Sequence, residues 1–352
     1  MDLLTFLRRI PKVELHVHLT GAVEPETLAV LAKRNGVSLP DGDLHETLYH
    51  RASGAEVKPI LPTLKIISQS MITARDFHRV AYDIQRKAAE AGVRHREIFW
   101  NPTDHATIGE VPYEVALEGL ISGLTDAEAD FSIRGRLIPS IDREQSPEAG
   151  LEMVEWVVAN PHDMVLGIGM DYLEIGNPPE KFWKSFKLAG EAGLKRTAHA
   201  GEFLEPARNV ETCLDLLKCD RIDHGYTVVD DLDLVARCRD EGMVFTVVPT
   251  NSTYLRVLAG QNFQEVHPLR KMGDLGLRIV PNSDDPPLHK IDPASAYLSM
   301  IEDFGFTLDD LRNQMENGIE GAWVSEDIKR AWKINWLAEF DRLRPEIDHV
   351  AA

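Results

Sequence analysis

The stretch VELHVHLTGA, residues 13–22, places two histidines one residue apart in an otherwise apolar run. Side chains alternate between the two faces of a strand, so His16 and His18 are expected on the same face. The opposite face is then expected to be apolar, with Val13, Leu15, Val17 and Leu19. Two imidazoles at one end of a strand predict a metal-binding pair; the alternative is a pair of surface histidines on a half-exposed strand.

Outward from this stretch, the chain repeats a short apolar run followed by a longer amphipathic segment. In ARDFHRVAYDIQRKAAEA, for example, apolar residues recur three to four positions apart, which predicts a helix. Eight runs are expected to be strands, and they span residues 13–19, 93–101, 133–139, 164–170, 194–200, 221–225, 244–249 and 277–283. Eight strands alternating with helices predict a parallel sheet covered by helices, and at this length they favour a (β/α)8 TIM barrel over an open sheet.

Two regions lie outside this repeat. Residues 40–75 are long for one crossover, and we expect them to be helical and lid-like. Residues 290–352 are expected to form terminal helices that close the barrel or pack beside it. The expected fold is therefore an α/β barrel with extra helices at the C-terminal face and the C-terminus. The chain contains no composition break, so we expect a single domain over residues 1–352.

Composition limits the classes of partner. The 57 acidic residues outnumber the 38 basic ones and give a net charge of −19, which repels polyphosphates, so no nucleic acid partner is expected. No stretch approaches the ~18 apolar residues of a membrane helix, and the N-terminus does not have the pattern of a signal peptide. Cys213, Cys219 and Cys238 lack CxxC spacing, which predicts reduced thiols in a cytoplasmic protein. The oligomeric state is left open.

The motif TAHAGE, residues 197–202, ends the fifth predicted strand. His199 stands at the strand end, and Glu202 follows three residues later across a turn of small residues. A water molecule bound to a metal needs a nearby group that moves protons, and Glu202 is suited to that role. The alternative is a hydrogen-bonded core histidine followed by a glutamate that starts a helix.

Two further motifs place polar residues at strand ends. RIDHG puts His224 at the end of the sixth strand, and PNSDDPP, residues 281–287, closes the eighth strand with Asp284 and Asp285. Adjacent carboxylates are typical of a solvated Asp-Pro turn. The functional interpretation gives them separate partners, one on a metal and one on a substrate donor, because the eighth strand of a closed barrel abuts the first.

Three imidazoles and a carboxylate form a site suited to Zn²⁺. No lysine stands at the end of the fourth strand, in VLGIGMDYLEIG, where a bridging ligand for a second metal would be expected. We therefore expect one zinc ion per chain. The alternative is a second metal held by Asp171 and Glu174.

Together, in this order, the motifs IPKVELHVHLTGAVEPETL, AHAGE, RIDHG and NSDDP resemble the adenosine/adenine deaminases of the amidohydrolase superfamily. The resemblance extends in weaker form over nearly the whole chain. It implies that zinc is bound by four residues, namely His16, His18, His199 and Asp284. It further implies that Glu202 passes a proton to a purine ring nitrogen, that His224 orients or deprotonates the attacking water, and that Asp285 meets the far edge of the purine. For Glu202 to donate a proton, its pKa is expected to be raised by burial.

The chain departs from the family pattern around the substrate. Thr20 stands where an acidic residue commonly follows HxHL, and in the nucleoside enzymes that acid helps to hold the sugar. The segment GMDYLEIGNPPEKF, residues 169–182, is more similar to the adenine-deaminase-like branch, and it places Gly169, Asp171 and Tyr172 at the expected pocket wall. Asn251 and Ser252 resemble the SN pair of the family in reversed order.

The function expected from the sequence is zinc-dependent hydrolytic deamination of a 6-aminopurine to the 6-oxopurine and ammonia. A modified adenine, a nucleotide or another amino-heterocycle remains open as the substrate. Two other hypotheses are hydrolysis of a phosphoester or amide on the same barrel, and a catalytically silent binding protein. Both are disfavoured, because the strand-4 lysine is missing and every expected metal ligand is present.

Overall fold

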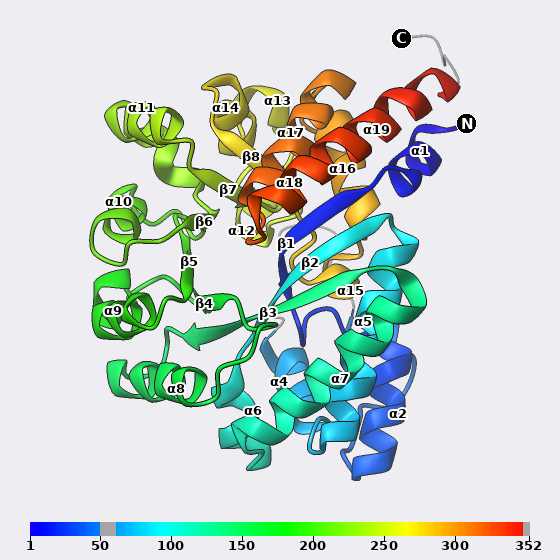
Figure 1. Ribbon diagram of the computed structural model, residues 1–352, viewed down its shortest axis with the longest axis vertical. Coiled ribbons are helices and arrows are strands. Elements are labelled where there is room, and N and C mark those ends of the chain that lie inside the picture. The colour runs from blue at the N-terminus through cyan, green and yellow to red at the C-terminus, as the bar shows by residue number, and fades with distance from the viewer. Residues whose placement is uncertain (50–60, 348–352) are drawn as a thin grey trace.

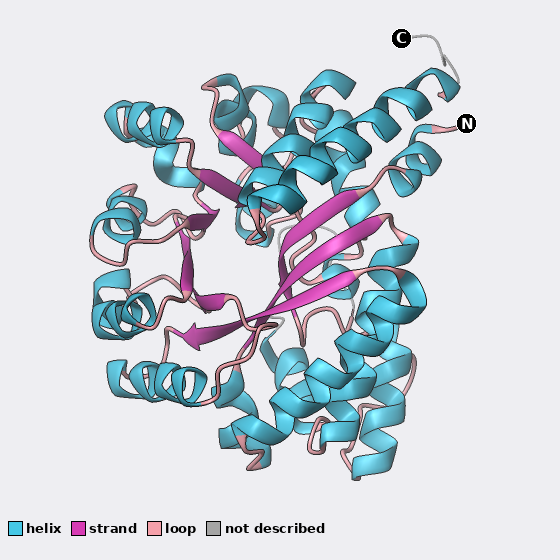
Figure 2. Ribbon diagram, in the orientation of Figure 1, coloured by secondary structure: helices cyan, strands magenta, loops and turns pink. Residues whose placement is uncertain are grey.

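The computed structural model describes residues 1–49 and 61–347. Its centre is a sheet of eight parallel strands that follow one another in chain order, surrounded by helices (Figures 1 and 2). The strands are β1 (Lys12–His18), β2 (Val93–Trp100), β3 (Arg134–Asp142), β4 (Gly167–Asp171), β5 (Lys195–Ala200), β6 (Arg221–His224), β7 (Val244–Val247) and β8 (Arg278–Pro281). The expected (β/α)8 barrel is confirmed.

Helices fill every connection between strands. Those before β4 are α1 (Leu3–Arg9), α2 (Pro25–Asn35), α3 (Leu44–Thr47), α4 (Leu61–Gln69), α5 (Ala74–Glu90), α6 (Pro102–Gly109), α7 (Tyr113–Phe131) and α8 (Pro147–Ala159). Those between β4 and β8 are η1 (Pro179–Phe182), α9 (Trp183–Glu191), α10 (Arg208–Asp215), η2 (Tyr226–Asp230), α11 (Leu232–Glu241), α12 (Ser252–Val257), α13 (Phe263–Val266) and α14 (Pro268–Asp274). Those after β8 are α15 (Pro286–His289), α16 (Pro293–Glu302), α17 (Leu308–Gly321), α18 (Glu326–Trp332), the π-helix η3 (Lys333–Leu337), α19 (Ala338–Leu343) and η4 (Arg344–Glu346).

The local sequence of helix α5 explains where this helix begins and which of its faces is buried. Helix α5 begins with a capping box, in which Thr73 and Asp76 each satisfy the other's backbone N–H. Its buried residues recur at helical spacing, among them Phe77, Val80 and Ile84, so one face of α5 packs on the barrel.

No helix within the described ranges combines the length and the apolar character that a membrane crossing needs.

The barrel closes between β8 and β1 through an asparagine side chain. Asn282 Oδ1 accepts hydrogen bonds from the backbone N–H groups of Leu15 (2.7 Å) and His16 (3.1 Å). Two residues later the backbones meet directly, because His18 N donates to Asp284 O (3.0 Å) and Asp284 N donates to His16 O (3.2 Å). This seam brings Asp284 next to the two histidines of β1.

Replacing Asn282 by alanine is expected to destabilise the fold. Two buried N–H groups would lose their acceptor, at about 1–3 kcal/mol each, so the free energy of unfolding should fall by about 2–6 kcal/mol. Denaturant unfolding measures it. Asn317→Ala is the matched control, because Asn317 donates only one hydrogen bond to this strand (3.2 Å to Ile279 O) and its loss should cost about 1 kcal/mol. Equal losses in the two variants would show that Asn282 does not hold the seam.

A β-bulge in β1 corrects one expectation from the sequence. The pairing of β1 with β2 shifts between Glu14 and Val17, so Glu14 lies opposite Arg96 and binds its guanidinium (2.5 Å). Val13 and Leu15 therefore do not share a buried face with Val17; they pack with another set of residues, Val244, Val280 and Ala322. The expected single apolar face is wrong for these two residues, although His16 and His18 still point the same way.

The end of the barrel away from the strand C-termini is closed by charged and aromatic side chains. Arg221 of β6 donates to Glu97 of β2 (2.7 Å) and to the carbonyl of Gly321 (3.1 Å) at the end of α17. The ring of Trp323 lies 4.3 Å from the guanidinium carbon of Arg221. These side chains fill this end of the barrel, and barrels of this kind bind their ligands at the opposite end, where the strands have their C-termini.

The two regions outside the repeat are helical where they are described. Residues 40–75 contain α3 and α4, and the rest of the expected lid, residues 50–60, lies outside the described residues. Residues 290–347 form α16 to η4, which run beside β1 toward the N-terminus (Figure 1). The two ends of the described chain meet there, because the Met1 amino group donates to Glu346 O (2.6 Å).

Candidate active site

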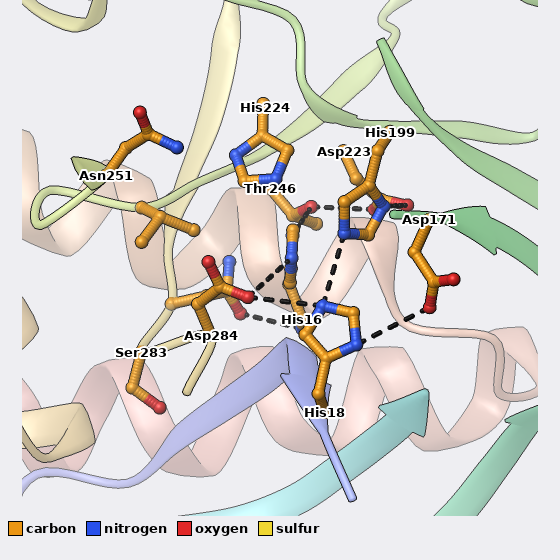
Figure 3. A network of polar contacts seen from close by, with 12 residues as sticks. His16, His18, Asp171, His199, Asp223, His224, Thr246, Asn251, Ser283 and Asp284 are labelled. Carbon is orange, nitrogen blue, oxygen red and sulfur yellow. Dashed lines mark hydrogen bonds and ion pairs between the residues drawn. The ribbon is translucent and has the colours of Figure 1, made fainter. Parts of the chain in front are cut away.

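Four side chains from three strand ends converge at the C-terminal mouth of the barrel (Figure 3). His18 Nε2 lies 3.2 Å from His199 Nε2 and 3.2 Å from Asp284 Oδ1. His16 Nε2 lies 3.3 Å from the same Asp284 oxygen. The structure thus brings together all four residues that the sequence predicted as metal ligands.

Each of the three imidazoles is held from behind at Nδ1 by an oxygen atom. Thr246 donates its only hydroxyl proton to Asp223 Oδ1 (2.8 Å), so its oxygen accepts from His16 Nδ1 (3.0 Å). Asp223 Oδ2 lies 3.4 Å from His199 Nδ1, and Asp171 Oδ2 lies 3.5 Å from His18 Nδ1 (Figure 3). The hydrogen bond with Thr246 keeps the proton of His16 on Nδ1, so its Nε2 faces the centre of the site. The two longer contacts place a carboxylate behind His199 and behind His18.

The backbone is strained at two residues of the central cluster. His224 and Asp284 have φ angles of 62° and 64°, a left-handed conformation that residues other than glycine seldom adopt. Both residues are buried at strand ends. Strain of this kind persists only where the surrounding structure fixes it, and it is concentrated at functional sites.

Glu202 lies beside this cluster with its carboxyl group between two partners. Asn251 Nδ2 donates to Glu202 Oε1 (2.9 Å), and Glu202 Oε2 lies 3.5 Å from His224 Nε2. Burial raises the pKa of Glu202 well above its usual value, and the charges of Asp284 and Glu174 raise it further. This shift favours the protonated form of the side chain, which can give its proton to a ligand.

His224 faces the same centre as a neutral imidazole. Burial lowers the pKa of its ring well below the usual value, and the nearby His16 and His199 act in the same direction. Neither of its ring nitrogens has a hydrogen-bond partner among the described residues. An imidazole whose closest polar contact is the 3.5 Å approach of Glu202 Oε2 keeps a ring nitrogen that can accept a proton from water.

The comparisons with known proteins agree with this geometry. The sequence model of the adenosine deaminase family matches residues 11–334. The chain belongs to the adenosine deaminase family.

Individual members of the family match almost the whole chain. The adenine deaminase of Psychrobacter cryohalolentis is 33% identical over 330 residues, which are 94% of this chain and 97% of that protein. An amidohydrolase of Burkholderia ambifaria crystallised with bound zinc superposes with a TM-score of 0.94 at 48% identity, covering 97% of this chain and 94% of that one. The adenine deaminase of Arthrobacter aurescens superposes with a TM-score of 0.86 at 32% identity, covering 95% and 99%.

As a member of the adenosine deaminase family the chain is a metal-dependent aminohydrolase, and its donor set fits zinc. Ligand atoms 2.0–2.1 Å from a tetrahedral zinc lie about 3.3 Å apart, which matches the three separations of 3.2 and 3.3 Å that link these four residues. The ligand atoms of His16, His18 and Asp284 all lie within 4.8 Å of one another. Ring nitrogens and a carboxylate that face one centre are typical of a site that binds a cation. In spite of burial, Asp284, Asp285 and Asp171 raise the pKa of His18 to about 10, so the site favours positive charge.

The second metal that the sequence left open has no place in this site. Asp171 is engaged by His18 and by Asn101, whose Nδ2 donates to its Oδ1 (2.7 Å). Glu174 accepts three N–H hydrogen bonds. Within residues 1–49 and 61–347, no cluster of potential metal ligands includes either carboxylate.

The predicted substrate residues fall into two groups. Asp285 and Thr20 lie next to the metal ligands, Asp285 directly after Asp284 and Thr20 two residues beyond His18. Asp285 Oδ1 is buried and has no hydrogen-bond partner among the described residues, so it can accept one from a ligand. It lies so close to Gly21 that a Cβ there would come within 1.6 Å of it.

The other three predicted substrate residues have partners inside the protein. Asp171 supports His18, and the hydroxyl group of Tyr172 donates to Asp104 Oδ2 (2.5 Å). A Cβ at Gly169 would meet the Phe99 ring at 3.1 Å, so this glycine leaves room for that ring. Phe99 in turn contacts the rings of His16 and His18, so Gly169 affects the metal ligands through packing.

The sequence analysis missed Asp223 and Thr246, and it named Asn251 and Glu174 without their contacts to Glu202. Asp223 and Thr246 hold the ligand histidines, while Asn251 and Glu174 contact the carboxyl group or the backbone of Glu202. Asp223 stands in the RIDHG motif itself, one residue before His224, and this position was the one signal that could have identified it. Asn251 also stood in a segment that resembles the family, but its partner could not be read from the sequence.

Proposed function

We propose that this chain hydrolyses free adenine to the 6-oxopurine and ammonia, within the aminohydrolase reaction that its family performs. The observation that carries the proposal is the placement of the part-buried Glu202 carboxyl group beside the four-donor cluster, 3.5 Å from His224 Nε2. The choice of the free base is supported by the relatives named adenine deaminase and by Thr20, which offers no carboxylate to a sugar.

We assign the zinc site to the four converging residues, His16, His18, His199 and Asp284. When bound, zinc supplies a Lewis acid that lowers the pKa of a water molecule from about 16 toward about 7. His224 accepts the proton from the attacking water at Nε2. Glu202 donates its proton to N1 of the purine, which makes C6 more electrophilic. The proton held by His224 then passes to the amino group, ammonia leaves C6, and the C6 hydroxyl returns its proton to Glu202, which leaves the 6-oxopurine.

Asp285 is proposed to bind the substrate at the edge of the purine away from C6. Its unpartnered Oδ1 is suited to accept a hydrogen bond from a ring N–H of the five-membered ring. Thr20 is proposed to border the place where a nucleoside would carry its sugar. Asp171, Tyr172 and Gly169 shape the wall of the pocket through His18, Asp104 and Phe99.

A substrate panel tests this proposal. Ammonia release is measured on the zinc-loaded chain with adenine, adenosine, adenosine monophosphate and N6-substituted adenines. The proposal expects the highest kcat/KM for adenine. A higher kcat/KM for a nucleoside or nucleotide would contradict the choice of the free base, and no ammonia from any of them would contradict the reaction.

Thr20→Asp is expected to raise kcat/KM for adenosine relative to adenine. A carboxylate at this position adds a charge-assisted hydrogen bond to a sugar hydroxyl, worth roughly 1.5–3 kcal/mol, or about 10- to 100-fold in the ratio. The control is Thr20→Asn, because asparagine has nearly the shape of aspartate but no charge. An unchanged ratio in Thr20→Asp would show that the sugar lies elsewhere or is never bound.

The expected partner is a small amino-heterocycle, with no nucleic acid or membrane. A cytoplasmic location is also part of the proposal. It is supported by the three cysteines, Cys213, Cys219 and Cys238, which are all free thiols and buried.

A further inference from the structure

Glu174 lies on the loop between β4 and η1 and is fully buried. Its carboxylate accepts hydrogen bonds from Gly201 N (3.0 Å), Glu202 N (3.0 Å) and Asn209 Nδ2 (2.8 Å). The first two donors are consecutive backbone amides in the turn that follows β5, and the third belongs to α10. A buried carboxylate with three donors is well satisfied, so it fixes the turn in one position.

The turn held by Glu174 lies against a neighbouring element. Gly201 has a φ of 67°, and a Cβ there would come within 2.5 Å of Thr227 Oγ1, so the backbone passes close to η2. Glu202 follows directly, and its carboxyl group is held from the other side by Asn251 (2.9 Å). Glu174 therefore fixes the backbone of Glu202, and Asn251 fixes its carboxyl group.

We propose that Glu174 is a positioning residue for deamination, which acts by fixing the turn that presents Glu202 to the substrate. The inference rests on the proposed role of Glu202 as the proton donor. A displacement of about 1 Å in a reacting group costs up to about 10²-fold in rate, so a loosened turn is expected to affect turnover strongly. The negative charge of Glu174 also helps burial and Asp284 to raise the pKa of Glu202, which favours the same protonated form.

The test is a double-mutant cycle of Glu174→Gln and Glu202→Gln. In Glu174→Gln the amide group turns a donor toward one of the three N–H groups, so the turn loses an acceptor while the side-chain shape is kept. In the otherwise unchanged chain we expect kcat for adenine to fall about 10- to 100-fold. The KM should change by less than about 3-fold and one zinc ion per chain should remain, because the metal ligands and the substrate contacts are untouched.

The same substitution in the Glu202→Gln background separates positioning from a general structural effect. If Glu174 acts through Glu202, adding Glu174→Gln to Glu202→Gln should lower kcat by less than about 2-fold. An equal loss in both backgrounds, a loss of zinc, or no loss in the unchanged chain would overturn the inference. The matched control is Glu180→Gln in η1, whose half-exposed carboxylate lies 3.9 Å from Arg208; it should leave kcat unchanged.

Two further measurements keep the test decisive. If Glu174→Gln does not fold, Glu174→Asp is used in the same cycle, because it keeps the charge but places the carboxylate one methylene too far from the two amides. If the unchanged chain releases no ammonia from adenine, the proposed substrate fails. The cycle is then run with the aminopurine that the chain does deaminate, and its outcome decides the role of Glu174 separately.

Discussion

Glu202→Gln is expected to lower kcat for adenine by about 10²- to 10⁴-fold, the usual contribution of a general acid. An amide cannot give up a proton to N1 of the purine, while its size and its hydrogen bond with Asn251 can be kept. Zinc should remain at one ion per chain, because the four proposed ligands are unchanged. The measurement is kcat from ammonia release, together with the zinc content of the same sample.

Glu205→Gln is the matched control for this variant. Glu205 stands in the same loop, three residues further along, and should leave both kcat and zinc content unchanged. If Glu202→Gln deaminates adenine at the parent rate, the proton donor lies elsewhere in the site. The inference about Glu174 would fall with it, whereas the zinc site would stand.

His199→Ala is expected to lose zinc and activity together. This substitution removes one of the four donors and leaves Asp223, which faces His199 Nδ1 at 3.4 Å, without its imidazole partner. Removing only the group behind a metal ligand typically costs 10- to 100-fold in affinity, so removing the ligand itself should cost more. Zinc affinity is measured by competition with a chelator, and activity by ammonia release.

The control for this variant is His162→Ala, an exposed histidine on the loop before β4. It should bind zinc and turn over as the unchanged chain does. Full activity of His199→Ala with zinc still bound would remove His199 from the ligand set. Loss of activity with unchanged zinc affinity would show that His199 has a catalytic role other than binding the metal.

Much of the barrel could be predicted because its pattern is local. Each strand is a short apolar run bounded by turn residues, and each helix shows its own periodicity. The errors arise where a strand depends on its neighbour. Thus β4 begins at Gly167, because residues 164–166 touch β3 only through a single bridge between Val165 and Leu137. The bulge in β1 is equally invisible in the sequence, since it is defined by the pairing with β2.

The residues of the candidate site also differ in whether the sequence could predict their roles. The ligand set could be predicted because His16, His18, His199 and Asp284 stand in motifs at strand ends, and parallel strands bring their ends to one mouth. The groups that hold these ligands could not, because their partners are far apart in the chain. Thr246 meets His16 across 230 residues, and Asn282 meets Leu15 across 267. Glu174 was considered as a metal ligand because a sequence shows a carboxylate but not its donors.

The central claim is that donors from β1, β5 and the end of β8 bind one zinc ion at the barrel mouth. The direct measurement is anomalous diffraction at the zinc edge from crystals grown with ample zinc. We expect a single peak within about 2.0–2.2 Å of three Nε2 atoms and one carboxylate oxygen, those of His16, His18, His199 and Asp284. A peak elsewhere, or His16 and Asp284 pointing to separate places around it, would contradict the account.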